Sequence, residues 1–240
     1  MDRSDLYARG QQHHKAVIRF FPDGRVHVSA RRVLKPGLAP FPRDVEVERE
    51  RTERRAKANV RWRCESLGAD HLLTLTYREN LENLSISRDH LRQYLRSIRK
   101  VDPSFKCVAV AERQKRGSIH WHIAVKGFQN VNRLRALWHR TIFPYDGNID
   151  VQFYRTRGRF TIAQYIAKYI GKGFDGVRPR YDHHYTTSRG IVVNKVVHYA
   201  APFGDLELRD WLEGLITKSG AAVMSWWVRE DGGSAGCQSW

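Results

Sequence analysis

The chain has 240 residues, of which 41% are hydrophobic, so it can fill one compact core and still leave extensions. Lysine and arginine outnumber aspartate and glutamate by 42 to 25, and the formal net charge of +17 concentrates polyanions around the protein. Nucleic acid is the expected partner, although charge alone separates neither DNA from RNA nor a binder from an enzyme. No apolar run approaches the roughly twenty residues that cross a bilayer, and residues 1–5 lack the apolar core of a signal peptide. We therefore expect no membrane partner and a cytoplasmic location.

The chain has three cysteines, Cys64, Cys107 and Cys237, which are odd in number and far apart. None lies in a CxxC arrangement, so neither a disulfide framework nor a zinc ribbon is indicated. We expect buried or incidental thiols.

Hydrophobic periodicity and turn residues divide the chain into strands and helices. Strands are predicted at 17–21, 26–30, 71–77, 107–112, 118–126, 149–154 and 192–199. Helices are predicted at 45–67, 87–100, 131–142, 162–170 and 206–217. Ser87 is expected to cap the second helix. Residues 182–189 are expected to form a loop, and the C-terminal end, rich in Trp, Gly and Ser, is expected to lack regular structure.

This order predicts an α+β fold, in which an antiparallel sheet of about five strands carries helices on one face in a ferredoxin-like arrangement. The chain is expected to divide into three parts. These are an N-terminal hairpin and link over 1–44, a main domain over 45–200, and a C-terminal helix and tail over 201–240.

Two histidines flank one tryptophan in the predicted strand 118–126. Because side chains alternate across a strand, His120 and His122 point to one face, whereas Ile119 and Trp121 point to the other and take the core. The imidazoles then lie together on the opposite surface, close enough to bind one divalent ion. The HxH pair alone is a weak signal, since an exposed pair of histidines is more often solvated surface.

A third metal ligand strengthens this interpretation. Glu112 lies on the partner strand of the same hairpin, where pairing across the short turn would bring it near the histidines. A carboxylate and two imidazoles suit Mg²⁺ or Mn²⁺, with positions left for substrate oxygens. The alternative is that Glu112 only balances Arg113 or Arg116, and a register slip of one residue would reverse its face.

The segment 160–172 places tyrosines and lysines on one side of a helix. At about 100° per residue, Tyr165, Lys168, Tyr169 and Lys172 share a face, and a stripe of alanine and isoleucine takes the other. Aromatic residues four apart are usually packing residues, but these share a face with lysines, which should be wet or should face an anion. Tyrosines at the margin of a core remain the alternative.

The chemistry of phosphodiester cleavage gives a reason for this composition. A phenol has a pKa of about 10 and is a weak nucleophile at neutral pH, so its target phosphate must be activated and the phenolate stabilised. A metal ion on the histidines would polarise a phosphate oxygen, and the lysines would offset negative charge in the transition state. Attack on DNA forms a phosphotyrosine ester that preserves the bond for rejoining and frees a 3′-hydroxyl. A second tyrosine one turn away permits a second cleavage before the first ester is resolved.

Three motifs resemble those of the HUH endonucleases, and specifically of the two-tyrosine initiators of rolling-circle replication in single-stranded DNA phages and related plasmids. They are Leu72-Leu73-Thr74-Leu75-Thr76, Ile119-His120-Trp121-His122, and the tandem from Tyr165 through Lys168 and Tyr169 to Lys172. Their order and spacing match over about residues 60–173. The resemblance implies that the histidines bind Mg²⁺ or Mn²⁺, that the tyrosines attack DNA at an origin and that a nearby lysine assists. It also makes Glu112 a plausible third ligand, residues 45–200 a nuclease domain, and a bacterial host cell the setting.

The chain departs from many relatives, which carry a helicase domain after the nuclease. Gly171-Lys172-Gly173 lacks the upstream glycine of a phosphate-binding loop, so unwinding would come from a host helicase. Neither end of the chain carries a motif that we can assign, and origin recognition can lie in either.

Two other interpretations stay open. A single-stranded DNA transposase or a conjugative relaxase would use the same chemistry, although relaxases usually have a third histidine and small transposases one tyrosine. A non-catalytic single-strand DNA-binding module would instead use Trp121 and the tyrosines to stack bases.

Overall fold

The computed structural model describes residues 13–33, 45–153, 158–170, 185–200, 205–220, 225–228 and 234–238. The chain forms two compact units, one made of residues 1–43 and 193–240 and the other of residues 44–192. Each unit has a five-stranded sheet of its own.

The larger unit has an antiparallel sheet with the strand order β6-β3-β5-β4-β7. Its strands are β3 (His71–Tyr77), β4 (Cys107–Arg113), β5 (Ile119–Val125), β6 (Gly147–Phe153) and β7 (Tyr185–Thr187). Its helices are α2 (Val45–Leu67), α3 (Leu84–Val101), α4 (Val131–Ile142) and α5 (Gly158–Ala167). The predicted α+β class with an antiparallel five-stranded sheet is confirmed. The edge strand β7 lies where the sequence predicted a loop over 182–189, and it pairs with β4.

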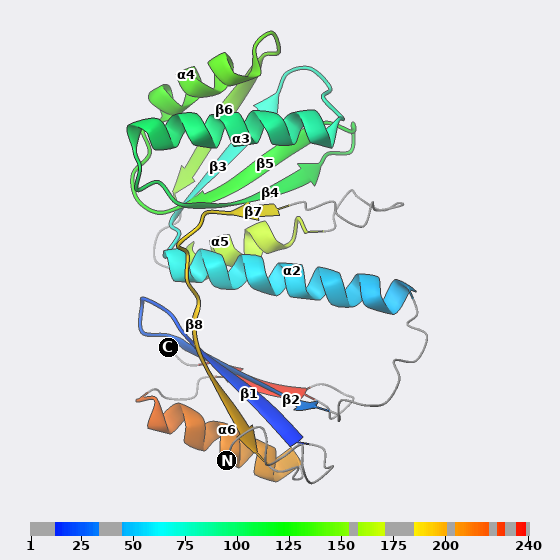
Figure 1. Ribbon diagram of the computed structural model, residues 1–240, viewed down its shortest axis with the longest axis vertical. Coiled ribbons are helices and arrows are strands. Elements are labelled where there is room, and N and C mark those ends of the chain that lie inside the picture. The colour runs from blue at the N-terminus through cyan, green and yellow to red at the C-terminus, as the bar shows by residue number, and fades with distance from the viewer. Residues whose placement is uncertain are drawn as a thin grey trace. The chain divides into compact units, whose positions relative to one another are not determined.

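Helices cover both faces of this sheet rather than one (Figure 1). The apolar sides of α3 and α4 pack on the face that carries Trp121, and α2 and α5 pack on the face that carries Val110 and Ala124. All seven residues of β5 are buried, because its alternate side chains enter two different cores. The expectation of helices on one face was therefore wrong.

Helix α3 begins three residues before the predicted start. The side chain of Asn83 caps it by accepting hydrogen bonds from the backbone N–H groups of Ser85 and Ile86. Ser87 is buried instead and accepts a hydrogen bond from Trp121 Nε1 at 2.8 Å, so the predicted cap at Ser87 was wrong. A polar side chain inside the first turn thus fixes the tryptophan of the histidine strand.

The smaller unit joins segments from both ends of the chain. Its sheet has the order β8-β1-β2-β10-β9, and an apolar face of the helix α6 packs against β1 and β2. The elements are β1 (His13–Phe20), β2 (Val26–Val33), β8 (Asn194–Ala200), α6 (Asp205–Lys218), β9 (Ser225–Val228) and β10 (Ser234–Gln238). Strand pairing therefore joins the N-terminal hairpin to C-terminal segments that had been expected as a separate helix and an irregular tail.

Two predictions about the remaining chemistry of the chain can be compared with the structure. Cys64 and Cys107 are buried free thiols, and burial raises the pKa of both. Among the residues that the structure describes, no helix is both long and apolar enough to cross a membrane.

Candidate active site

The hairpin of β4 and β5 sets the relative positions of Glu112 and the histidines. Glu112 is paired directly with His120, and Val110 with His122. The turn is closed by a hydrogen bond from the Gln114 N–H to the Ser118 carbonyl. Its Gly117 has a φ of +93°, a conformation that favours glycine. This turn fixes the register that sequence reasoning had left open, and it places Glu112 on the face of the two histidines.

His122 and Glu112 are in direct contact. His122 Nε2 lies 2.8 Å from Glu112 Oε2, and Thr74 Oγ1 lies 3.4 Å from His122 Nδ1. The exposed fractions are 8% for Glu112, 8% for His120 and 5% for His122, so the expectation that the imidazoles lie on an open surface was wrong. Helices α2 and α5 cover this face, because Val110 and Ala124 make it apolar beside the polar groups.

His120 has one nitrogen engaged and one without a hydrogen-bond partner. Its Nδ1 lies 2.9 Å from the side-chain amide of Gln114, and its buried Nε2 has no partner among the described residues. Burial, with a smaller contribution from His122, lowers the pKa of His120 to about 4, although Glu112 acts in the opposite direction. The imidazole is therefore neutral at neutral pH, which is the form that binds metal ions.

The donor set fits a divalent metal ion in its chemistry. In the described parts of the chain, no three His, Cys, Asp or Glu side chains already converge on one point as a metal cluster does. The reason is that His122 and Glu112 are bonded to each other. An ion would take the place of this hydrogen bond and would use the unpartnered Nε2 of His120. Gln114 would then orient the His120 ring from its other nitrogen.

Helix α5 carries the tyrosines to this face. Its buried side, which includes Ile162 and Ile166, packs in the same cluster as Val60 of α2. The helix ends at Ala167, three residues before the predicted end. A further turn continues with a hydrogen bond from the Tyr169 N–H to the Ile166 carbonyl at 3.2 Å. The buried stripe thus leaves the tyrosine side turned toward β5.

The two tyrosines meet the second histidine. The ring of Tyr169 stacks on the ring of His122, with 4.0 Å between centroids and 10° between planes, and Tyr165 meets the same imidazole edge-on at 6.2 Å. The Tyr169 hydroxyl donates a hydrogen bond to the Tyr165 hydroxyl at 2.6 Å. The Lys168 ammonium lies 3.8 Å from the Tyr165 ring centroid and 5.0 Å from that of Tyr169. The histidine strand and the tyrosine segment therefore share one site.

The tyrosines differ in their exposure. Tyr169 is buried, with 5% of its surface exposed, whereas Tyr165 is half-buried. The fourth predicted residue of this group, Lys172, lies outside the described residues.

Sequence reasoning missed two residues of this site, Gln114 and Thr74, as partners of the imidazoles. Gln114 follows Glu112 by two positions, the period of a strand face, and this spacing was the available signal. Thr74 stood in the first quoted motif and is paired with His122 across β3 and β5.

Residues 70–174 match a family model of replication-associated proteins, that of the ORF2 type. The matched segment covers less than half of the chain but contains β3, β4, β5 and α5, and with them Glu112, both histidines and both tyrosines. Over its candidate site the chain is thus similar to replication-associated proteins, which supports a replication-initiator type and an interaction with DNA. Comparisons with curated proteins and with solved structures gave no match.

Proposed function

We propose that this chain is a replication initiator of the HUH type, which nicks single-stranded DNA at an origin by tyrosine attack and later rejoins the strand. The similarity of residues 70–174 to replication-associated proteins supports the initiator role. The observation that carries the proposed chemistry is the contact of His122 with both Glu112 and Tyr169, whose hydroxyl is bonded to Tyr165.

In the proposed reaction, a phenol oxygen attacks the phosphorus atom and the bond from phosphorus to O3′ breaks. The phenol loses its proton, and the departing O3′ gains one and becomes a free 3′-hydroxyl. The 5′-phosphate remains on the protein as a phosphotyrosine ester, which a 3′-hydroxyl attacks when the strand is rejoined.

Tyr165 is the better placed of the two for the first attack. It is half-buried, and its oxygen accepts the hydrogen bond from Tyr169, so the bond stabilises negative charge on Tyr165 rather than on its donor. Lys168 contributes a positive charge over the same ring. Tyr169, which is stacked on His122, is left for the second cleavage.

Glu112, His120 and His122 are the proposed ligands of Mg²⁺ or Mn²⁺. When bound, the ion would supply Lewis-acid polarisation of the scissile phosphate. The chain's own part is to hold three donors on one strand pair, with Gln114 and Thr74 beside the imidazole nitrogens. The proposed role of Lys172 is to offset negative charge beside the tyrosines, as Lys168 does.

Adduct formation with a labelled single-stranded DNA library of random sequence tests this function. With Mn²⁺, strands labelled at the 3′ end should give a labelled adduct that survives denaturation. Strands labelled at the 5′ end should give only shortened DNA with a free 3′-hydroxyl. The double change Tyr165→Phe with Tyr169→Phe should abolish the adduct. Tyr145→Phe is the matched control, because Tyr145 packs against the core on the other face of the sheet.

Two results would contradict the proposal. One is an adduct that persists in the double variant, and the other is an adduct labelled through the 5′ end. DNA binding without any adduct would favour the non-catalytic binding module. A transposase or relaxase would give the same adduct, but loss of plasmid replication in the double variant would separate an initiator from either. A host helicase is the proposed further partner, since no helicase motif was found in the sequence.

A further inference from the structure

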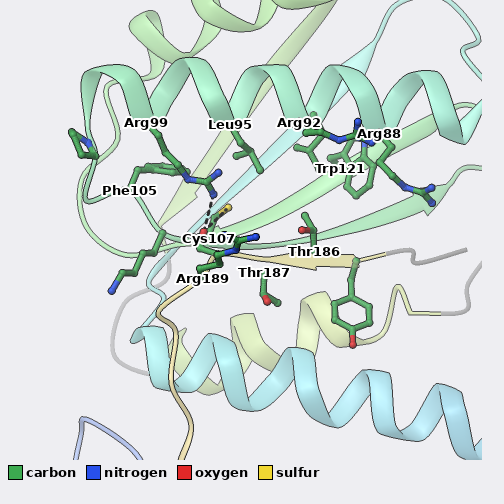
Figure 2. Close-up of a pocket in the computed structure, with 15 residues that line it drawn as sticks. Arg88, Arg92, Leu95, Arg99, Phe105, Cys107, Trp121, Thr186, Thr187 and Arg189 are labelled. Atoms are coloured by element: carbon green, nitrogen blue, oxygen red, sulfur yellow. Dashed lines mark hydrogen bonds between the residues drawn. The ribbon is translucent and has the colours of Figure 1, made fainter. Parts of the chain in front are cut away.

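A groove on the other face of the sheet, away from the histidines, is lined by positive charge. It lies between α3 and the edge formed by β4 and β7, and it encloses a cavity of about 730 Å³ (Figure 2). This volume is within the range of pockets that hold small molecules and is sufficient for a nucleotide. The basic side chains of the lining come from α3, β4 and β7 and the chain beside these strands: Arg88, Arg92, Arg99, Lys106 and Arg189.

The floor of this groove is apolar. Leu91, Leu95 and Phe105 contribute to it, together with Trp121, and each is at most 7% exposed. Among the residues that the structure describes, no acidic side chain lines the groove. The nearest acid in sequence is Asp89, which pairs with Arg92 at 3.0 Å on the exposed side of α3. An apolar floor under a cationic rim fits a ligand that has a planar apolar part and a negative charge, as a nucleotide has.

One guanidinium in the groove is held in place by the fold. Figure 2 shows Arg99 and Leu95 pointing from α3 toward the sheet, with Thr186 on the facing side of β7. Arg99 donates a hydrogen bond to Ser188 Oγ at 2.9 Å, and the Cys107 N–H donates to the same oxygen at 2.9 Å. Ser188 is buried, so the guanidinium is already ordered before a ligand arrives.

Strand β7 separates the groove from the tyrosines and lies at the edge of the sheet. Tyr185 of β7 lines the groove, and it also packs against the core cluster that contains Tyr169. A flexible strand that passes over this edge can therefore contact both faces, whereas a stiff duplex cannot bend around three residues.

We propose that this groove binds nucleotides of single-stranded DNA that flank the cleaved bond, with bases on the apolar floor and phosphates on the arginines. The inference rests on the proposed function for the identity of the nucleic acid. Stacking of bases on guanidinium planes and contacts between arginine and phosphate are the interactions that such channels use.

Equilibrium binding of a fluorescent thirty-nucleotide oligothymidine, measured by anisotropy over a range of salt concentrations, tests the groove. The groove variant combines Arg92→Gln with Arg189→Gln, two exposed residues whose loss should leave the fold intact. The matched control combines Arg96→Gln with Lys100→Gln, which removes the same charge from exposed positions of α3 outside the groove.

The groove variant should bind on the order of tenfold more weakly near 0.1 M salt, and its salt slope should fall by about 1.4, since each phosphate contact contributes about 0.7. The control should change affinity less than about twofold. As a second arm, Thr186→Glu should weaken binding as the groove variant does, and Thr186→Gln, which has the same size without the charge, should not. Equal effects in the groove and control variants, or equal effects of Thr186→Glu and Thr186→Gln, would overturn the inference.

Adduct formation on a short oligonucleotide that covers only the cleaved bond distinguishes the two proposals. The groove variant should retain the parent yield on this substrate. The double tyrosine variant should lose the adduct and keep oligothymidine affinity. If the double tyrosine variant still forms adducts, the proposed function fails. If the groove variants bind like the parent, only the groove inference fails.

Discussion

The hydrogen bond between the two tyrosines predicts that their single variants differ. In Tyr169→Phe, Tyr165 keeps its position and Lys168, but its oxygen loses the donor at 2.6 Å. A hydrogen bond to a charged group contributes about 1.5–3 kcal/mol, so losing it from a developing phenolate should slow attack by about 10- to 150-fold. In Tyr165→Phe, the first nucleophile itself is missing, and only slow attack by the buried Tyr169 remains.

Single-turnover kinetics of adduct formation, with Mn²⁺ and excess protein, measure this difference. The expected order of rate constants is the parent, then Tyr169→Phe, then Tyr165→Phe, with the double variant at background. The fold should be unaffected, because each change removes one hydroxyl at the margin of the core. A reversed order of the two single variants, or parent rates in Tyr169→Phe, would refute the assignment of Tyr165 as the acceptor and first nucleophile.

Three further outcomes follow from the packing and charge of this unit. Ile166→Ala should lower the free energy of unfolding by about 2–5 kcal/mol and reduce adduct yield, because this fully buried side chain anchors the tyrosine segment. In thermal melts, Ile86→Ala at a 38% exposed position is the control and should change little. The pKa of His120 is lowered from its ordinary value of about 6.5, so the unfolded chain binds the proton first and stability should decrease as pH falls from about 6.5 toward 4. Urea unfolding in a chelator should show a smaller decrease for His120→Asn, and an identical decrease would contradict the cause. Asn83→Ala should cost about 1 kcal/mol through loss of the α3 cap and leave adduct formation unchanged, and Ser85→Ala at an exposed neighbouring position is its control.

The elements of the larger unit could be predicted from the sequence because their periodicity is strong. The predicted bounds of α2, β3 and α4 agree with the structure at both ends. Helix α3 was placed late, since Ser87 and Asn83 are both good capping residues and only the tertiary contact of Ser87 with Trp121 decides between them.

The sequence could not show what covers the histidine face. Alternation places His120 and His122 together, but it does not tell whether helices cover that side of the sheet. The apolar neighbours Val110 and Ala124 were the available signal, since an open surface would not need them. For the same reason the pairing of β1 with β8, which joins distant segments through long-range contacts, had no local sign in the sequence.

The site itself could be predicted in part. The facing of Tyr165 and Tyr169 follows from helical arithmetic and agrees with the observed contacts. The stacking of Tyr169 on His122 depends on how α5 packs on the sheet, which periodicity does not give.

Mass spectrometry of the purified adduct tests the central claim most directly. Trypsin cleaves after Arg159, Lys168 and Lys172, so Tyr165 and Tyr169 fall in separate peptides, residues 160–168 and 169–172. After nuclease digestion, the account predicts a nucleotide 5′-phosphate on the tyrosine of residues 160–168 and, when a second cleavage occurs, on that of residues 169–172. A nucleotide attached to any other residue, with both peptides unmodified, would contradict it.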